Sequence, residues 1–328
     1  MFNAFVFTDG RILKTNQKDI LKYIKKTENI VWIDLEDPNE DEIDMLIDKF
    51  DFHQLSIEDA IFPQDHPKIE EFENYVFITL YGISYDDVIS TQELNIFFGK
   101  NYVITFHEKK LNSITRLMNK INRIKDKETG TLIGGGNDIS KGSDILLYTI
   151  IDSLINEYFV ITEKLDVNME KLENKVLEEK EEEILDDLFK QKKNILIFRK
   201  FITMEMQLIN KLCRAEVDFI REKTKVYFRD IYDHIARING DLEILREIIP
   251  SFIESYWSMY SKKLNQSIHR LTVLATIAIP MMIITSYYGM NLELPEFKFG
   301  FFGVIFMWGL MILSSLILFL LLKWKKWI

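Results

Sequence analysis

The sequence predicts a mixed α/β domain, followed by long helices and by two transmembrane helices near the C-terminal end. Three observations predict this class. Four segments within residues 1–127 are rich in β-branched and aromatic residues, the chain has helical periodicity from Ser143 onward, and two long uncharged apolar stretches follow. A chain of 328 residues can hold two or three domains and bury a sizeable core.

Residues 1–127 are expected to form the α/β domain, which we expect to be cytoplasmic. Between the first two predicted strands, Ile43, Leu46, Ile47 and Phe50 recur at helical spacing, after a capping-box pattern of Asn39 and Glu42. The predicted strands are Ile30–Leu35, Tyr75–Tyr81, Leu94–Phe98 and Tyr102–Phe106.

Residues 128–142 are expected to form a glycine-rich linker, because glycines cluster there and interrupt both kinds of periodicity. Residues 143–262 are expected to form a cytoplasmic helical stalk, in which Leu146, Ile150 and Leu154 recur every four residues. A helix that starts near Asp230 is expected to run into the first apolar stretch, with bends at Pro250 and Pro280.

The apolar stretches Leu271–Leu292 and Phe299–Leu322 contain no charged residue, and each exceeds the roughly 20 residues that cross a bilayer. We assign residues 263–290 to the end of the long helix and the first span. Residues 291–298 form an extracytoplasmic loop, residues 299–322 the second span and residues 323–328 a basic tail. Lysine and arginine precede the first span and lysine follows the second, so we expect an inner-membrane protein with both termini in the cytoplasm.

The charge distribution is uneven. Residues 261–328 carry seven Lys or Arg and two Glu, a net of +5, whereas the whole chain carries −10, so residues 1–260 carry −15. This acidic body argues against a nucleic-acid partner. The histidines and Cys213 lack metal-ligand spacing, and Lys141-Gly142-Ser143 has the wrong order for a phosphate-binding loop. We therefore expect neither an enzyme nor an organic cofactor.

The first span ends in Tyr288-Gly289-Met290-Asn291. At this point the sequence resembles the CorA-type magnesium/cobalt transporters, which have two C-terminal spans with Gly-Met-Asn closing the first. The resemblance extends over nearly the whole chain. It includes the segments His66–Glu70, Glu73–Ile78, Leu147-Tyr148 with Ile151-Asp152, Tyr227–His234, and the terminal Lys-Trp-Lys-Lys-Trp.

The resemblance implies a funnel-shaped homopentameric channel in the lipid bilayer, which transports Mg²⁺ and also Co²⁺ or Ni²⁺. Gly289, Met290 and Asn291 would form its selectivity filter, where backbone carbonyls and asparagine oxygens accept hydrogen bonds from a hydrated ion. From the residues alone, an ordinary helix C-cap is the favoured explanation of Gly289 and Asn291.

One stripe of the first span is predicted to line the pore, because its residues recur at steps of three and four. By resemblance, Asn265 would form a polar ring, and Ile268 and Leu271 a hydrophobic gate. Simple helix packing would give the same periodicity. The stripe contains Asn265, Ile268, Thr272, Ala275, Ile279, Met282 and Ser286, and the resemblance adds Leu271 to the pore-lining set.

Charged residues at both ends of the pore are further candidates. The loop acids Glu293 and Glu296 would concentrate cations at the outer mouth, or would be ordinary exposed loop residues. Lys323, Lys325 and Lys326 would form a basic ring at the cytoplasmic end.

The resemblance also implies metal sensing between cytoplasmic subunits. Asp59 and Asp230 match positions that face each other there, while Glu58 and Glu157 are weaker candidates for a neighbouring site and Glu254 lies near the inner entrance. Regulatory Mg²⁺ bound between carboxylates would favour the closed state, since it relieves their repulsion.

Two alternatives stay open. One is a zinc transporter of the same superfamily, although Met290 favours magnesium, since that branch varies the middle residue of the motif. The other is a membrane-anchored signalling protein that conducts nothing.

Overall fold

The computed structural model describes residues 1–8, 11–64, 66–125, 132–133, 137–178, 184–214, 217, 219–290, 300–325 and 327. The chain divides into two compact units, Met1–Phe252 and Ile253–Ile328. Unit 1 holds most of the chain, and unit 2 holds the two long apolar stretches near the C-terminal end.

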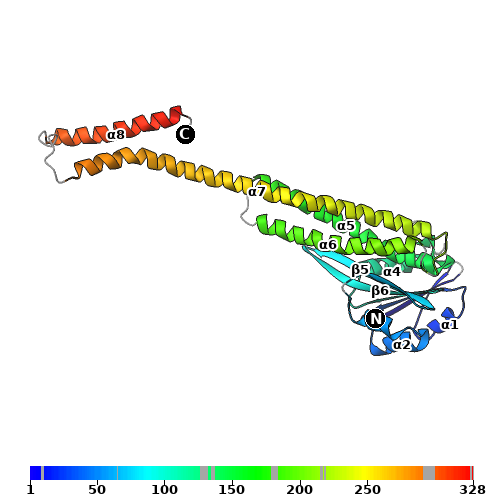
Figure 1. Cartoon of the computed structure of the whole chain (residues 1–328). Coiled ribbons are helices and arrows are strands. Elements are labelled where there is room, and N and C mark those ends of the chain that lie inside the picture. Colours follow the sequence, from blue (N-terminus) through cyan, green and yellow to red (C-terminus); the bar gives the residue numbers. More distant parts are fainter. Residues whose placement is uncertain are drawn as a thin grey trace. The chain divides into compact units, whose positions relative to one another are not determined.

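Unit 1 is built on a seven-stranded sheet with the order β2-β1-β3-β7-β6-β5-β4 (Figure 1). Neighbouring strands are antiparallel except β3 and β7, which are parallel. The strands are β1 (Phe2–Thr8), β2 (Arg11–Thr15), β3 (Ile30–Glu36), β4 (Lys68–Glu71), β5 (Tyr75–Asp86), β6 (Val88–Gly99) and β7 (Tyr102–His107).

The central strands of this sheet carry apolar side chains on both faces, and helices cover both faces. The side chains of Val31, Ile33 and Leu35 pack in one core cluster with residues of α1 (Ile20–Ile24), α2 (Glu40–Phe50) and α3 (Gln54–Ile61). The opposite face is covered by α4 (Asn112–Lys125), α5 (Ser143–Glu178) and α6 (Ile184–Arg214) (Figure 1).

The capping box predicted at Asn39 is confirmed. The Asn39 side chain accepts from the Glu42 backbone N–H at 2.9 Å, and the Glu42 carboxylate accepts from the Asn39 N–H at 3.1 Å. Both contacts satisfy donors that would otherwise be unpaired in the first turn of α2.

All four predicted strands are confirmed, but three further strands, β1, β2 and β4, complete the sheet. The second and third predicted strands are also longer than expected, because β5 and β6 form a hairpin of twelve residues on each side. Seven of the fifteen residues of the glycine-rich segment, including four of its five glycines, lie outside the described residues. Its described part contains β8 (Leu132–Ile133), β9 (Asn137–Asp138) and the short 3₁₀ helix η1 (Ile139–Lys141).

The predicted long helix is α7 (Lys225–Tyr288), which contributes to both units and continues through Pro250 and Pro280. The last helix is α8 (Phe301–Trp324). Among the described helices, α5, α7 and α8 have the length and composition to cross a membrane. The apolar window of α5 is 67% buried, against 0% for α7 and 11% for α8. Helix α5 is therefore a core helix of unit 1.

An ion pair with a buried carboxylate joins the start of α5 to the turn before α7. Asp144 is 1% exposed, and its carboxylate accepts from the Arg221 guanidinium and from the Thr224 hydroxyl at 2.6 Å. Burial alone would raise the pKa of Asp144, but the hydrogen bonds from Arg221 and Thr224 outweigh burial and lower it. The ionised carboxylate therefore stabilises the folded state.

Replacing Asp144 by alanine is expected to destabilise unit 1 by about 2–4 kcal/mol, because the change removes the carboxylate partner of a partly buried guanidinium and the acceptor of a buried hydroxyl. Asp144 stabilises the protein fully at a pH above the pKa that its carboxyl has in the unfolded chain. This stabilisation is lost as the pH falls through the lower pKa that the carboxyl has in the folded chain. Thermal unfolding of the full chain measures the change. Asp166→Ala, at an exposed site on α5, is the control and is expected to change stability little.

Candidate functional site

The first two residues of the Gly-Met-Asn motif directly follow the end of α7. The Gly289 N–H donates to the Thr285 carbonyl at 2.9 Å, and the Met290 N–H donates to the Tyr287 carbonyl at 3.3 Å. A Cβ at Gly289 would lie 3.0 Å from the Thr285 oxygen, so the helix end is tight there. Among the described glycines only Gly300 has positive φ, so Gly289 follows α7 without adopting the left-handed conformation that many helix ends use.

Two faces of the apolar part of α7 differ in exposure within unit 2. One stripe is partly covered, and it faces α8, since the Ser315 hydroxyl of α8 donates to the Ile277 carbonyl at 3.2 Å. This stripe contains Val273, Thr276, Ile277, Pro280, Ile284 and Tyr288. At 100° per residue its centre lies roughly 140° around the helix from the centre of the predicted pore stripe.

The predicted pore stripe is exposed along its whole length in the single chain. Ile268 is 51% exposed, Leu271 67%, Ile279 50% and Met282 67%. Asn265, Thr272, Ala275 and Ser286 are exposed as well. Because α8 does not cover this face, the stripe is available to pack against other chains around an axis.

The hydroxyl of Thr272 points back along α7 and donates to the Ile268 carbonyl at 2.8 Å. Because its single proton is used, the Thr272 oxygen can only accept further hydrogen bonds at this level of the stripe. Such an oxygen suits the outward-pointing hydrogens of a hydrated cation.

Several predicted residues lie outside the described residues. They are Asn291 of the motif, the loop acids Glu293 and Glu296, and Lys326 of the basic ring. Lys323 and Lys325, at the end of α8, are exposed.

Among the candidate regulatory residues, Asp59 on α3 is only partly exposed and already has partners within the chain. Its carboxylate forms an ion pair with Lys68 and accepts from the Gln64 side-chain amide at 3.1 Å. The adjacent Glu58 is exposed. A metal ion between subunits would therefore compete with Lys68 for Asp59.

Asp230 on α7 is 56% exposed at its side chain, and the Nε2 atom of His234 lies 3.8 Å from its carboxylate. The structure brings Asp152 of α5 into the same neighbourhood. Burial raises the pKa of Asp152 and the negative charge of Asp230 raises it further, against the opposing effects of His234 and Asn156. Sequence reasoning missed this pairing, because Asp152 and Asp230 are far apart in the chain.

Glu157 on α5 is mostly buried and forms an ion pair of 3.4 Å with Arg116, and burial raises the pKa of its carboxyl. Glu254, in unit 2, is exposed. Within the part of the chain that the structure describes, no three His, Cys, Asp or Glu side chains lie close enough together to hold a metal ion.

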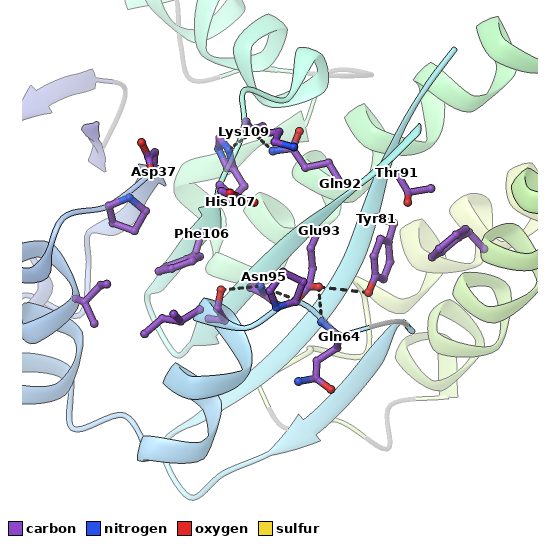
Figure 2. A pocket seen from close by; sticks show the side chains of 17 residues that line it. Asp37, Gln64, Tyr81, Thr91, Gln92, Glu93, Asn95, Phe106, His107 and Lys109 are labelled. Carbon is purple, nitrogen blue, oxygen red and sulfur yellow. Dashed lines mark hydrogen bonds between the residues drawn. The ribbon is translucent and has the colours of Figure 1, made fainter. Parts of the chain in front are cut away.

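A separate pocket of about 380 Å³ opens in unit 1, near the ends of β3 and β7 (Figure 2). Glu93 lies at its wall and accepts from the Gln64 N–H at 2.8 Å, from Asn95 at 3.0 Å and from the Tyr81 hydroxyl at 3.3 Å. Burial raises the pKa of Glu93. The pocket includes none of the candidate pore or regulatory residues.

His107, which lines this pocket, is a structural histidine. Its ring contacts Asp34 at 3.1 Å and the Lys109 carbonyl at 2.8 Å, so both nitrogens have partners. Burial alone would lower the pKa of His107, but its contacts with Asp34 and Lys109 raise it.

Comparisons with known proteins place the chain in a family. A family model described as "CorA-like Mg2+ transporter protein" matches residues 27–324. The cobalt/magnesium transport protein CorA of Thermotoga maritima is 31% identical, and the match covers 97% of this chain and 89% of that protein. The zinc transport protein ZntB of Photorhabdus laumondii is 24% identical, and the match covers 80% of this chain and 77% of that protein.

The fold agrees with a solved structure from the same family. The CorA magnesium transporter of Methanocaldococcus jannaschii superposes with a TM-score of 0.84 and 24% identity, covering all of this chain and 99% of that one. Because the family model spans most of the sequence, including both α7 and α8, the chain belongs to the CorA-like Mg²⁺ transporter family, whose members are divalent-cation transporters of membranes rather than enzymes.

Proposed function

We propose that this protein is a homopentameric channel-type transporter for Mg²⁺, with Co²⁺ and Ni²⁺ as further substrates. In this proposal the exposed stripe of α7 lines a central pore, and the Gly-Met-Asn turns of the subunits form its outer mouth. The observation that carries the proposal is the uncovered stripe from Asn265 to Ser286, roughly opposite the face that contacts α8.

Selection at the mouth would act on the hydrated ion. Mg²⁺ holds its waters tightly and requires octahedral geometry, so a filter that stripped these waters would conduct slowly. A ring of Gly289 and Met290 backbone oxygens with Asn291 amides can instead accept hydrogen bonds from the waters. Glu293 and Glu296 would raise the local cation concentration.

The two apolar helices support a membrane location for the proposed pore. Residues 271–288 of α7 and most of α8 contain no charge and are long enough to span the hydrocarbon layer. The lysines beside both spans, among them Lys262, Lys263, Lys323 and Lys325, favour an inner-membrane protein with both termini in the cytoplasm.

Flux into liposomes that contain a Mg²⁺-reporting dye tests the proposal. We expect Mg²⁺ uptake that Co²⁺ and Ni²⁺ inhibit by competition. Preferential Zn²⁺ flux coupled to a proton gradient would support the zinc alternative, for which the ZntB relative is the motivation. No flux of any divalent ion would identify a non-conducting membrane anchor and would refute the proposal.

Regulation by internal Mg²⁺ is the second part of the proposal. Asp230 is exposed and close enough to Asp152 for their charges to interact, so the α5–α7 surface offers a negative field that a cation between subunits would neutralise. Further carboxylates at neighbouring positions would add to this negative field, from Asp59, Glu58 and Glu157. Another, that of Glu254, would lie near the inner entrance of the pore. Bound Mg²⁺ would favour the closed state.

Asp230→Asn is expected to leave transport intact and to weaken its inhibition by internal Mg²⁺. The concentration of internal Mg²⁺ that halves the flux should rise about tenfold, the effect of losing roughly 1.4 kcal/mol of favourable charge interaction. Asp233→Asn, at an exposed site on the same helix, is the control. Equal inhibition of wild type and Asp230→Asn would remove Asp230 from the site.

A further inference from the structure

Glu205 is a fully buried glutamate on α6 that is not part of the proposed ion path. It is 0% exposed. One carboxyl oxygen, Oε1, lies 2.7 Å from the Tyr81 backbone nitrogen of β5, and the other, Oε2, lies 2.9 Å from the Tyr158 hydroxyl of α5. The same hydroxyl also contacts the Tyr81 carbonyl oxygen. Three elements therefore meet at one carboxyl group.

The number of protons in this network determines the state of Glu205. The Tyr158 oxygen is close to two other oxygens, the Glu205 Oε2 and the Tyr81 carbonyl, but a hydroxyl has only one proton to donate. If Glu205 were ionised, one of these two contacts would bring two lone pairs together without a proton. A protonated Glu205 gives each contact one proton, because Oε2–H donates to Tyr158 and the Tyr158 hydroxyl then donates to the Tyr81 carbonyl.

The surroundings of Glu205 favour the neutral form as well. None of the ion pairs found among the described residues involves Glu205. A buried carboxylate without a cation is costly, and such a group usually takes up a proton instead. In agreement, burial raises the pKa of Glu205 to about 8, although the contacts with Tyr81 and Tyr158 act in the opposite direction.

We propose that Glu205 holds a proton at neutral pH, and that this protonated carboxyl group is a pH-sensitive latch that fastens α5 and α6 to strand β5. Loss of the proton would place an unpaired charge in the core and break the cyclic hydrogen-bond pattern. The contact between the helices and the sheet would then loosen as the pH rises, next to Tyr81, whose hydroxyl contacts Glu93 in the wall of the pocket.

The other titratable groups around the latch do not replace Glu205 in this role. Helix α5 contributes Tyr158, whose pKa is raised well above its usual value mainly by burial, and Glu157, whose charge acts on Tyr158. Strand β5 contributes Tyr81, which joins the network through its backbone, and β6 contributes Glu93 on the far side of the Tyr81 ring. Glu205 is thus the group in direct contact with the network that titrates near neutral pH.

Infrared spectroscopy of the full-length protein in detergent tests the protonation directly. The spectrum of wild type minus Glu205→Gln at pH 7 is expected to contain the C=O stretching band of a protonated carboxyl group. This band should disappear on titration with a midpoint near pH 8. A difference spectrum with only carboxylate bands at pH 7 would overturn the proposal. If the variant does not fold, the pH titration of the wild-type spectrum alone distinguishes the two outcomes.

The pH dependence of stability tests the latch. Glutamine resembles the protonated acid, because its amide donates to Tyr158 and its carbonyl accepts from Tyr81. For an acid whose folded pKa is raised, stabilisation is complete below its unfolded pKa, roughly 4.3, and declines as the pH rises to the folded value. We therefore expect the difference in stability between Glu205→Gln and wild type to increase, in favour of the variant, as the pH rises from about 4.3 to 8. Above pH 8 this difference should stay constant.

Hydrogen exchange locates the effect. At pH 8.5, the amides of β5 around Tyr81 should exchange faster in wild type than in Glu205→Gln, and those of β1 should exchange equally in both. Glu247→Gln, at an exposed site on α7, is the control and should follow wild type in both measurements. Parallel stability profiles for wild type and Glu205→Gln across this pH range would contradict the latch.

Discussion

Asn291→Ala is expected to abolish selective Mg²⁺ transport. In a pentamer this single change removes a ring of five amide oxygens from the proposed outer mouth. If each hydrogen bond to the hydrated ion contributes about 0.5–1.5 kcal/mol, the ring contributes several kcal/mol, and Mg²⁺ flux should fall roughly 10²-fold or more. Dye-reported Mg²⁺ uptake into liposomes measures this loss.

The matched control is Ser314→Ala on α8, whose hydroxyl donates to the Met311 carbonyl of its own helix at 3.0 Å. This variant should transport like wild type. If Asn291→Ala also transported like wild type, while remaining assembled, the Gly-Met-Asn turn would be a helix terminus without a role in ion selection.

Leu271→Ser is expected to produce a leak that internal Mg²⁺ no longer suppresses. Leu271 is 67% exposed in the single chain, and with Ile268 it would form an apolar constriction that excludes water from the closed pore. A ring of serines would let water remain in the constriction. A decrease of about 1.4 kcal/mol in the barrier would raise the flux through the inhibited transporter tenfold.

This leak is measured as uptake at an internal Mg²⁺ concentration that inhibits wild type. Leu313→Ser on α8 is the control, because Leu313 is 57% exposed but lies on the helix outside the proposed pore. An equally large leak in both variants would mean that the serine disturbs the bilayer contact rather than the gate. Unchanged inhibition in Leu271→Ser would place the gate elsewhere on α7.

Local signals in the sequence predicted much of the fold. Asn39 and Glu42 fix the start of α2 through contacts three residues apart, and such spacing is recognisable without tertiary structure. The uncharged stretches that become the end of α7 and α8 are equally clear from the sequence. The segment Phe2–Thr8 also has the apolar and β-branched composition of a strand, so β1 was recognisable but not identified.

The residues that sequence reasoning missed depend on distant partners. Glu205 lies on a helix with many charged residues, and only its contacts with Tyr81 and Tyr158, more than 40 residues away, distinguish it from a solvated glutamate. Asp152 is recognisable as a neighbour of Asp230 only in the folded chain. For Asp59, the sequence indicated a candidate metal ligand but not its ion pair with Lys68.

The proposed function depends above all on α7 helices from five chains surrounding one ion path. Native mass spectrometry of the detergent-solubilised protein determines how many chains assemble. We expect an assembly of five times the 39.0 kDa chain mass. A monomer or a dimer as the stable species would contradict the proposed pore, because the exposed stripe of α7 would then have no ring of partners to enclose it.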